Sequence, residues 1–339
     1  MRKSGKNLWI DAFSRVYVEE GAESFPLTAQ ILRNLPKAAV IPVGRYGELF
    51  SRKGQDFRLQ KNAPQLILAV KREGFFFPGA KVCENFGRAN FFYSSQILNC
   101  LYDCAYCYLQ GVYDSANLVV FVNIEHTFRE ISTFLSRAPM YLCVSYDTDL
   151  LALDRLTGLA ERWYEFAETK SNLMIELRTK CSNIGFLRRK DVNPNFVLAW
   201  TLSPERVCGL YERGSSSLKQ RLAALREAVD LGYTVRICLD PLLAVPDFEK
   251  LYGELIEEIF SVVKGDELLD VSVGTFRISG EYLKRLRKNR PDCALTRYPF
   301  TLRDGVYSYP PEKSAAMLGF VRGKLLHYVR ETQIYITDF

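Results

Sequence analysis

The sequence lacks the usual marks of a membrane or secreted protein. No apolar run reaches the roughly 20 residues needed to span a bilayer, and no signal-peptide core follows the basic start MRKSGK. The nine cysteines are an odd number, and most are scattered along the chain, which excludes a regular disulfide framework. We therefore expect a soluble, cytoplasmic protein whose thiols are reduced.

Charge of one sign is not in large excess either. The net charge is +6, and 48% hydrophobic with 25% charged residues is typical of a soluble enzyme. Residues 1–75 and residues 271–339 each carry +6, so the middle of the chain is slightly acidic. Basic flanks are compatible with a polyanionic partner such as nucleic acid, although a solvated basic surface is the simpler interpretation.

From residue 90 onward, strand-like runs alternate with helix-like ones. The expected strands are 90–96, 140–146, 172–180, 196–203, 234–240 and 270–277, and the expected helices between them are 125–137, 153–169, 217–232 and 247–263. Several strands are apolar nearly throughout, as in sheets covered on both faces. This pattern predicts an α/β fold of repeated βα units with a parallel sheet, either partly closed as a barrel or open and doubly wound.

The flanking regions differ from this core. Residues 1–89 read as a small α/β extension, with a helix at 25–36, strands at 38–44 and 64–72, and a polar loop at 44–57. Residues 281–339 read as a basic helix at 281–290, an aromatic-rich irregular stretch and a final helix at 312–330. We therefore divide the chain into an extension (1–89), a core (90–280) and a C-terminal region (281–339).

Three cysteines gather in the stretch NCLYDCAYCYLQG, residues 99–111. Cys100, Cys104 and Cys107 have C-x3-C-x2-C spacing, and a zinc site would need a fourth ligand. No second cysteine pair exists, and His126 and His327, the only histidines, lie in helical contexts. Three thiolates suit a [4Fe–4S] cluster with one iron left open to a substrate. The loop follows the first core strand, at the sheet edge where such folds bind ligands.

This loop resembles the CxxxCxxC signature of the radical S-adenosylmethionine (SAM) superfamily. The resemblance implies a partial (β/α)6 barrel that binds a [4Fe–4S] cluster and SAM. It further implies that SAM chelates the open iron, and that reductive cleavage of SAM yields a 5′-deoxyadenosyl radical.

The aromatic neighbours narrow the resemblance. CAYCYLQ, with Tyr106 and Tyr108 on either side of Cys107, resembles the cluster loop of the spore photoproduct lyase family. CVSYDTDLLALDRLTG (143–158), RTK (178–180), GSSSLKQRLAAL (214–225) and FPLTAQILRNL near the start are similar to other segments of that family. The similarity therefore covers most of the chain, and its most specific parts lie between residues 99 and 225.

The resemblance implies a DNA repair lyase that reverts the spore photoproduct, 5-thyminyl-5,6-dihydrothymine, to two thymines. Cys143 would donate the hydrogen atom that quenches the thymine radical. Tyr106 and Tyr108 would then pass a hydrogen atom between the Cys143 thiyl and deoxyadenosine, which regenerates SAM. The residue types suit these roles, because an S–H bond is weak enough to give its hydrogen to carbon and a phenol can hold an unpaired electron. Simple packing is the alternative role for all three.

Four polar residues match the family's SAM contacts less closely. Ser145 matches a serine two residues beyond the donor cysteine, and Lys180 matches a lysine expected near the SAM carboxylate. Thr201 stands where the family has serine. Asp240 stands where the family has a small apolar residue, and it could reach a ribose hydroxyl. Each could instead be an ordinary polar residue at a strand end.

The family also implies base flipping by a hairpin near the C-terminus, with phosphate contacts and a wedge. Here the candidates are Arg297, Tyr298, Arg303 and Tyr307, around an RDGVY sequence whose Asp-Gly favours a hairpin turn. A tyrosine-rich loop packed on the barrel is the alternative. The expected partners are DNA with a thymine photoproduct and an electron donor such as flavodoxin or ferredoxin. We expect a monomer.

Two other functions stay open. A radical SAM enzyme of the same family could act on a different nucleic-acid lesion, a small molecule or a peptide. The cysteine loop could also be a structural metal clip in a DNA-binding protein, which would require a fourth protein ligand.

Overall fold

The main sheet is a curled, mostly parallel half-barrel. The computed structural model describes residues 13–337. Six parallel strands lie side by side in chain order, and they confirm the six predicted strands. These strands are β5 (Phe91–Tyr93), β9 (Met140–Cys143), β10 (Leu173–Thr179), β11 (Phe196–Thr201), β13 (Thr234–Leu242) and β14 (Asp270–Thr275). At one edge β18 (Ile334–Thr337) adds in parallel, and at the other β4 (Phe77–Pro78) adds antiparallel.

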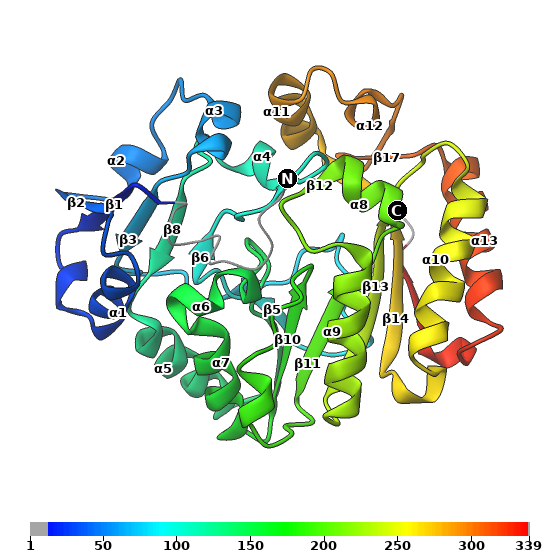
Figure 1. Ribbon diagram of the computed structural model, residues 1–339, viewed down its shortest axis with the longest axis horizontal. Helices are drawn as coiled ribbons and strands as arrows, with labels where there is room; N and C mark the ends of the chain where they lie inside the picture. Colours follow the sequence, from blue (N-terminus) through cyan, green and yellow to red (C-terminus); the bar gives the residue numbers. More distant parts are fainter. Residues whose placement is uncertain (1–12, 338–339) are drawn as a thin grey trace.

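Strands β9, β10, β11 and β13 end on the same side of the sheet, and we call this side the barrel mouth. Their last residues are Cys143, Thr179, Thr201 and Leu242. Because the strands are parallel, the side chains that follow them meet at this one end. Short loops and helices cover the mouth, including α8 (Glu205–Tyr211) and β12 (Glu212–Arg213), as Figure 1 shows. The candidate site residues at the strand ends therefore converge here.

The predicted core helices are confirmed, and they pack outside the sheet (Figure 1). They are α5 (Ile124–Leu135), α7 (Leu159–Glu168), α9 (Leu218–Asp230) and α10 (Phe248–Val262). Ser217 caps α9 in a capping box with Gln220, which fixes where this helix starts. The single helix predicted for 153–169 is divided at Gly158, whose φ of +64° favours glycine, and α6 (Asp154–Thr157) precedes the break. Among residues 13–337, no helix is both long and apolar enough to cross a membrane.

The N-terminal region builds a second, five-stranded sheet in the order β2-β1-β3-β8-β6. Its strands are β1 (Arg15–Glu19), β2 (Ala39–Val43), β3 (Leu66–Ala69), β8 (Leu118–Phe121) and β6 (Ile97–Leu98). The helix α1 (Pro26–Asn34) is confirmed, but β1 was not predicted. β6 and β8 come from beyond residue 90, so this sheet draws on both sides of the predicted domain boundary at 89, which stays a prediction.

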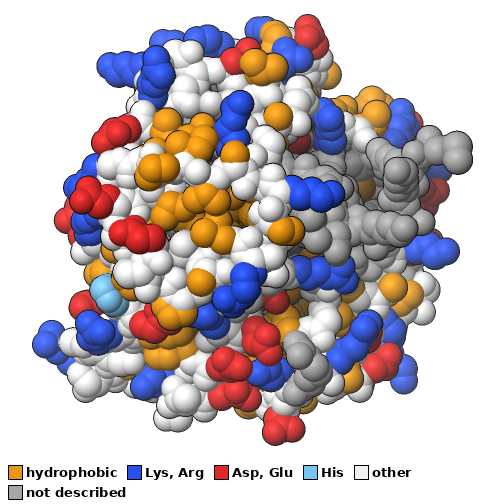
Figure 2. Space-filling view, turned by 60° about the vertical axis from the view of Figure 1, so that its left-hand side comes forward, with side chains coloured by type: hydrophobic (Ala, Val, Ile, Leu, Met, Phe, Trp, Pro, Cys, Tyr) orange, Lys and Arg blue, Asp and Glu red, His pale blue; other side chains and the backbone are white. Residues whose placement is uncertain are grey.

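The polar loop predicted for 44–57 is mostly confirmed, but a short helix interrupts it. It contains α2 (Gly47–Phe50) and runs into α3 (Phe57–Asn62), which Asp56 caps through the backbone N–H of Leu59. Both helices form because Phe50 and Phe57 are buried, at 4% and 3% exposure, and so offset the polar composition. Figure 2 shows this side of the molecule, where hydrophobic side chains are interspersed with charged ones. The edge strand β2 lies next to a shallow groove lined partly by Val40 and Leu32.

The C-terminal region folds over the barrel mouth. A small antiparallel sheet joins β15 (Arg277–Ser279), β17 (Val306–Ser308) and β16 (Thr301–Arg303). The predicted Asp-Gly turn is confirmed, because Asp304 and Gly305 connect the last two strands with φ of +49° and +79°. The predicted basic helix is α11 (Gly280–Asn289), and α12 (Ala294–Arg297) follows it. The final helix, α13 (Pro311–Leu325), ends earlier than predicted.

The basic helix α11 lies against α4 (Leu109–Val112), which directly follows the cysteine loop. Gly111 makes this approach possible, since a Cβ there would lie 2.4 Å from the Cα of Tyr282. Arg290 pairs with Asp103 inside the loop and donates to the side-chain oxygen of Gln110 at 2.9 Å. Part of the C-terminal positive charge is thus used to hold the cysteine loop.

Candidate active site

The three cysteines lie close together beneath the C-terminal region. Burial raises the pKa of Cys100 and Cys107 to about 11 and that of Cys104 to about 12, so the free thiols stay protonated at neutral pH. The thiols also act on one another: Cys107 raises the pKa of Cys100, Cys100 raises that of Cys104, and Cys104 raises that of Cys107. The loop also folds back on itself here, because the backbone N–H of Cys107 donates to the backbone oxygen of Cys104 at 3.2 Å.

Two lysines place positive charge beside these thiols. Lys61 donates to the backbone oxygen of Tyr102 at 2.9 Å and to that of Cys100, and it lowers the pKa of both Cys100 and Cys107. Lys180 lowers the pKa of Cys104. Both ammonium groups can offset the negative charge that three ligating thiolates would bring into a buried loop.

The three thiols are compatible with a [4Fe–4S] cluster. Among residues 13–337, no group of three or more His, Cys, Asp or Glu side chains is gathered as the ligands of one metal ion. In a [4Fe–4S] cluster each thiolate binds a different iron, so the three sulfurs need not converge on one point. Three neighbouring thiols flanked by lysines meet that requirement.

Cys143 ends β9 at the barrel mouth, with its side chain 6% exposed. It lies opposite Tyr93 of β5 and Glu176 of β10 in the sheet register. Burial, followed by the Glu176 carboxylate, raises the pKa of the Cys143 thiol to about 12, although the Arg178 guanidinium opposes this. Cys143 therefore keeps its hydrogen at neutral pH, as a hydrogen-atom donor must.

The two tyrosines beside Cys107 point to different partners. The hydroxyl of Tyr106 donates to the buried carboxylate of Glu212, and the ammonium of Lys180 lies 5.4 Å from the centre of the Tyr106 ring. The hydroxyl of Tyr108 donates to the backbone oxygen of Tyr146 at 2.7 Å and lies 3.4 Å from a carboxylate oxygen of Asp147. Burial raises the pKa of both phenols well above the usual value, so both keep their hydrogen.

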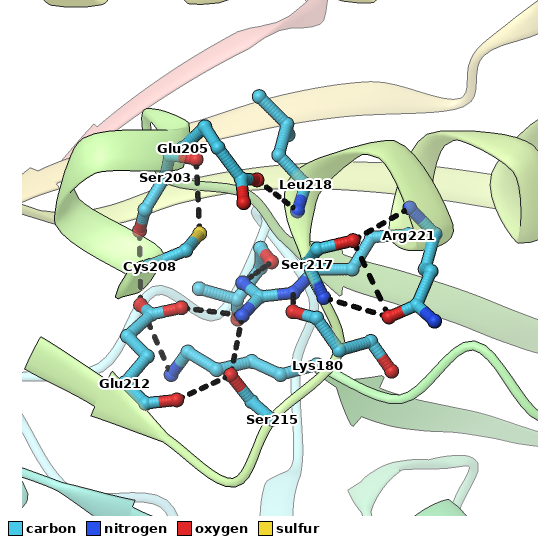
Figure 3. Close-up of polar contacts among 12 residues, drawn as sticks. Lys180, Ser203, Glu205, Cys208, Glu212, Ser215, Ser217, Leu218 and Arg221 are labelled. Carbon is cyan, nitrogen blue, oxygen red and sulfur yellow. Dashed lines mark hydrogen bonds and ion pairs between the residues drawn. The ribbon is translucent and has the colours of Figure 1, made fainter. Parts of the chain in front are cut away.

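Glu212 is the centre of a buried ionic network. Figure 3 shows this network together with the neighbouring helices α8 and α9. Its carboxylate pairs with Arg221, accepts from Ser203 at 3.0 Å and lies 4.0 Å from the Lys180 ammonium. Burial alone would raise the pKa of this carboxyl, but Lys180, Arg221 and Tyr106 together lower it to about 2. Sequence reasoning missed Glu212, since nothing in YERGSSS marks a glutamate that will be fully buried.

The residues predicted to bind SAM lie around the mouth. Ser145 is buried, and its oxygen accepts from the backbone N–H of Arg178 at 2.7 Å, so its own O–H remains a donor. Lys180 lies between Glu212 and the cysteine loop. Thr201 is buried, and its backbone oxygen accepts from Arg221 at 3.0 Å.

Asp240 already has strong partners. Its two carboxylate oxygens accept from Arg277 at 2.8 and 3.0 Å, and Arg178 lies at 3.7 Å. A ribose contact, which stays a prediction, would have to share this carboxylate with two guanidinium groups. The sequence did not predict that Arg178 and Arg277 pair with Asp240, although Arg178 lies in the RTK segment and Arg277 ends a predicted strand. Each arginine reaches Asp240 because β10, β13 and β15 bring distant segments together, which local sequence does not show.

The four residues predicted to contact DNA do not form one cluster. Arg303 is exposed on the β16–β17 hairpin, next to Leu302, which is 54% exposed. Tyr307, half-buried, lies in the same hairpin. Tyr298 packs in an aromatic cluster with Phe300 and Tyr309, and Arg297 is exposed as the last residue of α12.

Comparison with known proteins identifies the family. Residues 87–301 match the family model described as "Spore photoproduct lyase". This match covers most of the chain and includes the three cysteines, both tyrosines and Cys143. The chain belongs to the spore photoproduct lyase family.

Individual relatives agree with the family match. A spore photoproduct lyase of Geobacillus sp. (strain Y412MC61) is 26% identical over 76% of each chain, and one of Clostridium acetobutylicum is 22% identical over 84% of each. A solved spore photoproduct lyase complexed with dinucleoside spore photoproduct has a TM-score of 0.80 at 20% identity, covering 96% of this chain and 98% of the other. A double mutant solved with bound AdoMet and the same dinucleoside gives the same values. The fold is therefore that of the family's solved members.

Proposed function

We propose that this protein is a radical SAM lyase of DNA repair that reverts the spore photoproduct to two thymines. The observation that carries the proposal is the family match over residues 87–301, which spans the cysteine loop and Cys143. Two further observations support it. The curated relatives are named for this activity, and the family's solved structures hold dinucleoside spore photoproduct and AdoMet.

Cys100, Cys104 and Cys107 would hold a [4Fe–4S] cluster, with Lys61 and Lys180 balancing its charge. When bound, the cluster and SAM would supply the 5′-deoxyadenosyl radical chemistry needed to remove a hydrogen atom from C6 of the dihydrothymine. Ser145, Lys180, Thr201 and Asp240 are the proposed SAM contacts.

Cys143 would give its hydrogen atom to the thymine radical left after the methylene bridge breaks. The S–H bond breaks, a C–H bond forms and a thiyl remains on Cys143. Burial keeps this thiol protonated and keeps water away from the radical. Tyr106 and Tyr108 would then relay a hydrogen atom back from 5′-deoxyadenosine, and their raised pKa keeps both phenols ready to donate.

The β16–β17 hairpin would meet the DNA. Leu302 and Arg303 are exposed near its turn, an apolar wedge and a phosphate ligand side by side. Arg297 would add a second phosphate contact, while Tyr298 and Tyr307 would stiffen the hairpin base. The proposal also includes a cytoplasmic, monomeric protein that receives its electron from a flavodoxin or ferredoxin. Its chain would divide into three units, residues 1–89, 90–280 and 281–339.

Anaerobic assay of the reconstituted protein tests the proposal. We expect SAM, reductant and the dinucleotide photoproduct to yield the thymine dinucleotide in the wild type. In Cys143→Ala the bridge should still break, but the thymine radical should be quenched by other reagents, so the products change. A brown protein that cleaves SAM yet leaves the photoproduct intact would contradict the proposal and favour another substrate within the superfamily.

A further inference from the structure

A second thiol and a third tyrosine lie at the barrel mouth without an assigned role. Cys83, in the loop between β4 and β5, has its sulfur 3.6 Å from the hydroxyl of Tyr146. Both side chains are only partly buried. Burial raises the pKa of the Cys83 thiol, and Arg277 and Arg178 both act on it electrostatically. The Arg178 guanidinium therefore lowers the pKa of both the Cys83 and the Cys143 thiol.

Tyr146 connects this thiol to the cysteine loop. Its backbone oxygen accepts the hydroxyl of Tyr108 at 2.7 Å, and the two rings meet edge to face with centres 6.0 Å apart. The Tyr146 ring also stacks on Tyr93, with centres 4.1 Å apart and planes 24° apart. Tyr108 and Tyr146 are therefore direct neighbours.

The donor cysteine completes the set. The geometric link runs through Tyr146, whose hydroxyl lies 3.6 Å from the Cys83 sulfur and whose ring stacks on Tyr93. Tyr93, on which Tyr146 stacks, is the register partner of Cys143 across β5 and β9. Four residues that can lose a hydrogen atom thus surround one part of the mouth: Tyr108, Tyr146, Cys83 and Cys143.

We propose that Tyr146 and Cys83 are further catalytic residues of the hydrogen-atom relay and lie between Tyr108 and Cys143. This inference rests on the proposed lyase function. The Cys143 thiyl takes a hydrogen atom from the Cys83 thiol, so one S–H bond breaks and another forms. The Cys83 thiyl then takes a hydrogen atom from the Tyr146 hydroxyl, and the Tyr146 phenoxyl takes one from Tyr108.

The radical is then on the Tyr106–Tyr108 pair. This pair takes a hydrogen atom from the methyl group of 5′-deoxyadenosine. Each step exchanges one hydrogen atom for one radical, so no outside oxidant or reductant is needed. Thiol S–H and phenol O–H bonds have similar strengths, so these exchanges run in small energy steps. The route also suits the geometry, since the Tyr108 hydroxyl donates to the backbone oxygen of Tyr146 and its ring meets the Tyr146 ring edge to face, whereas the Tyr106 hydroxyl donates to Glu212.

The test uses Tyr146→Phe and Cys83→Ala with two matched controls. Tyr328→Phe removes a hydroxyl from a ring stacked on Phe260, and Cys293→Ala removes a free, partly buried thiol near α12. Each protein is reconstituted and assayed for thymine dinucleotide and for released 5′-deoxyadenosine. We expect both relay variants to raise the deoxyadenosine released per thymine dinucleotide by about tenfold or more, while the controls keep the wild-type ratio.

A second measurement separates chemistry from structure. The Tyr146→Phe ring can still stack on Tyr93, so the unfolding midpoint of the apoprotein should stay near that of the wild type. Alkylation of Cys83 in the same apoprotein should slow, because the lost hydroxyl was lowering the thiol pKa. Unchanged deoxyadenosine ratios in both variants, in a wild type that repairs the photoproduct, would overturn the relay alone. A wild type that leaves the photoproduct intact would overturn the proposed function and the relay with it.

Discussion

Tyr106 and Tyr108 stand two residues apart in one loop, yet their surroundings differ sharply. Tyr106 is 6% exposed and donates to Glu212, whose carboxylate is fully buried with Arg221 and Lys180 around it. Tyr108 is partly buried and donates to the backbone oxygen of Tyr146, whose own hydroxyl lies 3.6 Å from the Cys83 sulfur. The first tyrosine lies in an ionic network, the second in a group of residues that can exchange hydrogen atoms.

The comparison teaches that one sequence motif can place similar residues in unlike settings. A buried ion pair fixes geometry strongly, because removing one partner leaves an unpaired charge. Removing a neutral hydrogen bond between a phenol and a backbone oxygen costs far less free energy of unfolding. We therefore expect changes on the Glu212 side to appear mainly as lost stability, and changes on the Tyr146 side mainly as altered product ratios.

The largest effect is expected for Glu212→Gln. It leaves Arg221 fully buried without its carboxylate, which typically costs about 3–5 kcal/mol in the free energy of unfolding. Denaturant unfolding measures this change. The control is Glu227→Gln, which breaks the exposed pair with Arg188 and should cost less than about 1 kcal/mol. Equal costs in the two variants would contradict the ionic network.

Acid should break the same network. The folded pKa of Glu212 is lowered from 4.5 to about 2, so its stabilisation is present above pH 4.5 and is lost as the pH falls toward 2. The shift corresponds to roughly 3 kcal/mol. The stability gap between wild type and Glu212→Gln should therefore narrow below pH 4.5 in unfolding curves. A gap that stays constant down to pH 3 would count against this assignment.

Tyr106→Phe should have the next largest effect on stability. It removes a hydrogen bond to a charged group, which is worth about 1.5–3 kcal/mol. Thermal and denaturant unfolding of the apoprotein check it. Since Glu212 keeps Arg221 and Ser203, the loss should stay below that of Glu212→Gln; a larger loss would mean that the phenol matters more than the ion pair.

Tyr108→Phe should have the smallest effect on stability. Its main loss is a neutral hydrogen bond to the backbone, worth about 0.5–1.5 kcal/mol, and its contact with Asp147 is long, at 3.4 Å. Its effect on chemistry should be large: released 5′-deoxyadenosine should rise relative to repaired product. Unfolding and chromatography of one protein preparation give both values. A Tyr108→Phe protein less stable than Tyr106→Phe would reverse the comparison.

Much of the fold could be predicted because its signals are local. The apolar strands and the capped helix at 218–230 follow from periodicity and from Ser217, and the turn at Asp304-Gly305 follows from residue type. The cysteine loop was found by spacing alone. By contrast, α2 and α3 were missed because burial of Phe50 and Phe57 outweighs a polar composition, which only tertiary contacts decide.

The site was only partly predictable for a similar reason. Cys143 and the loop tyrosines could be matched to a family pattern. Glu212 meets Tyr106 across 106 residues, Cys83 meets Tyr146 across 63 residues, and Arg178 meets Asp240 on a different strand. Such pairs carry no periodic or spacing signal, so a single sequence does not reveal them.

One isotope measurement tests the central claim, that this chain repairs the photoproduct and returns the hydrogen atom to regenerate SAM. The wild type is incubated with photoproduct deuterated at C6 of the dihydrothymine, and the recovered SAM is examined by mass spectrometry. The account predicts deuterium in SAM together with repaired thymine dinucleotide. Repair without label in SAM, or label lost entirely to released 5′-deoxyadenosine, would contradict it.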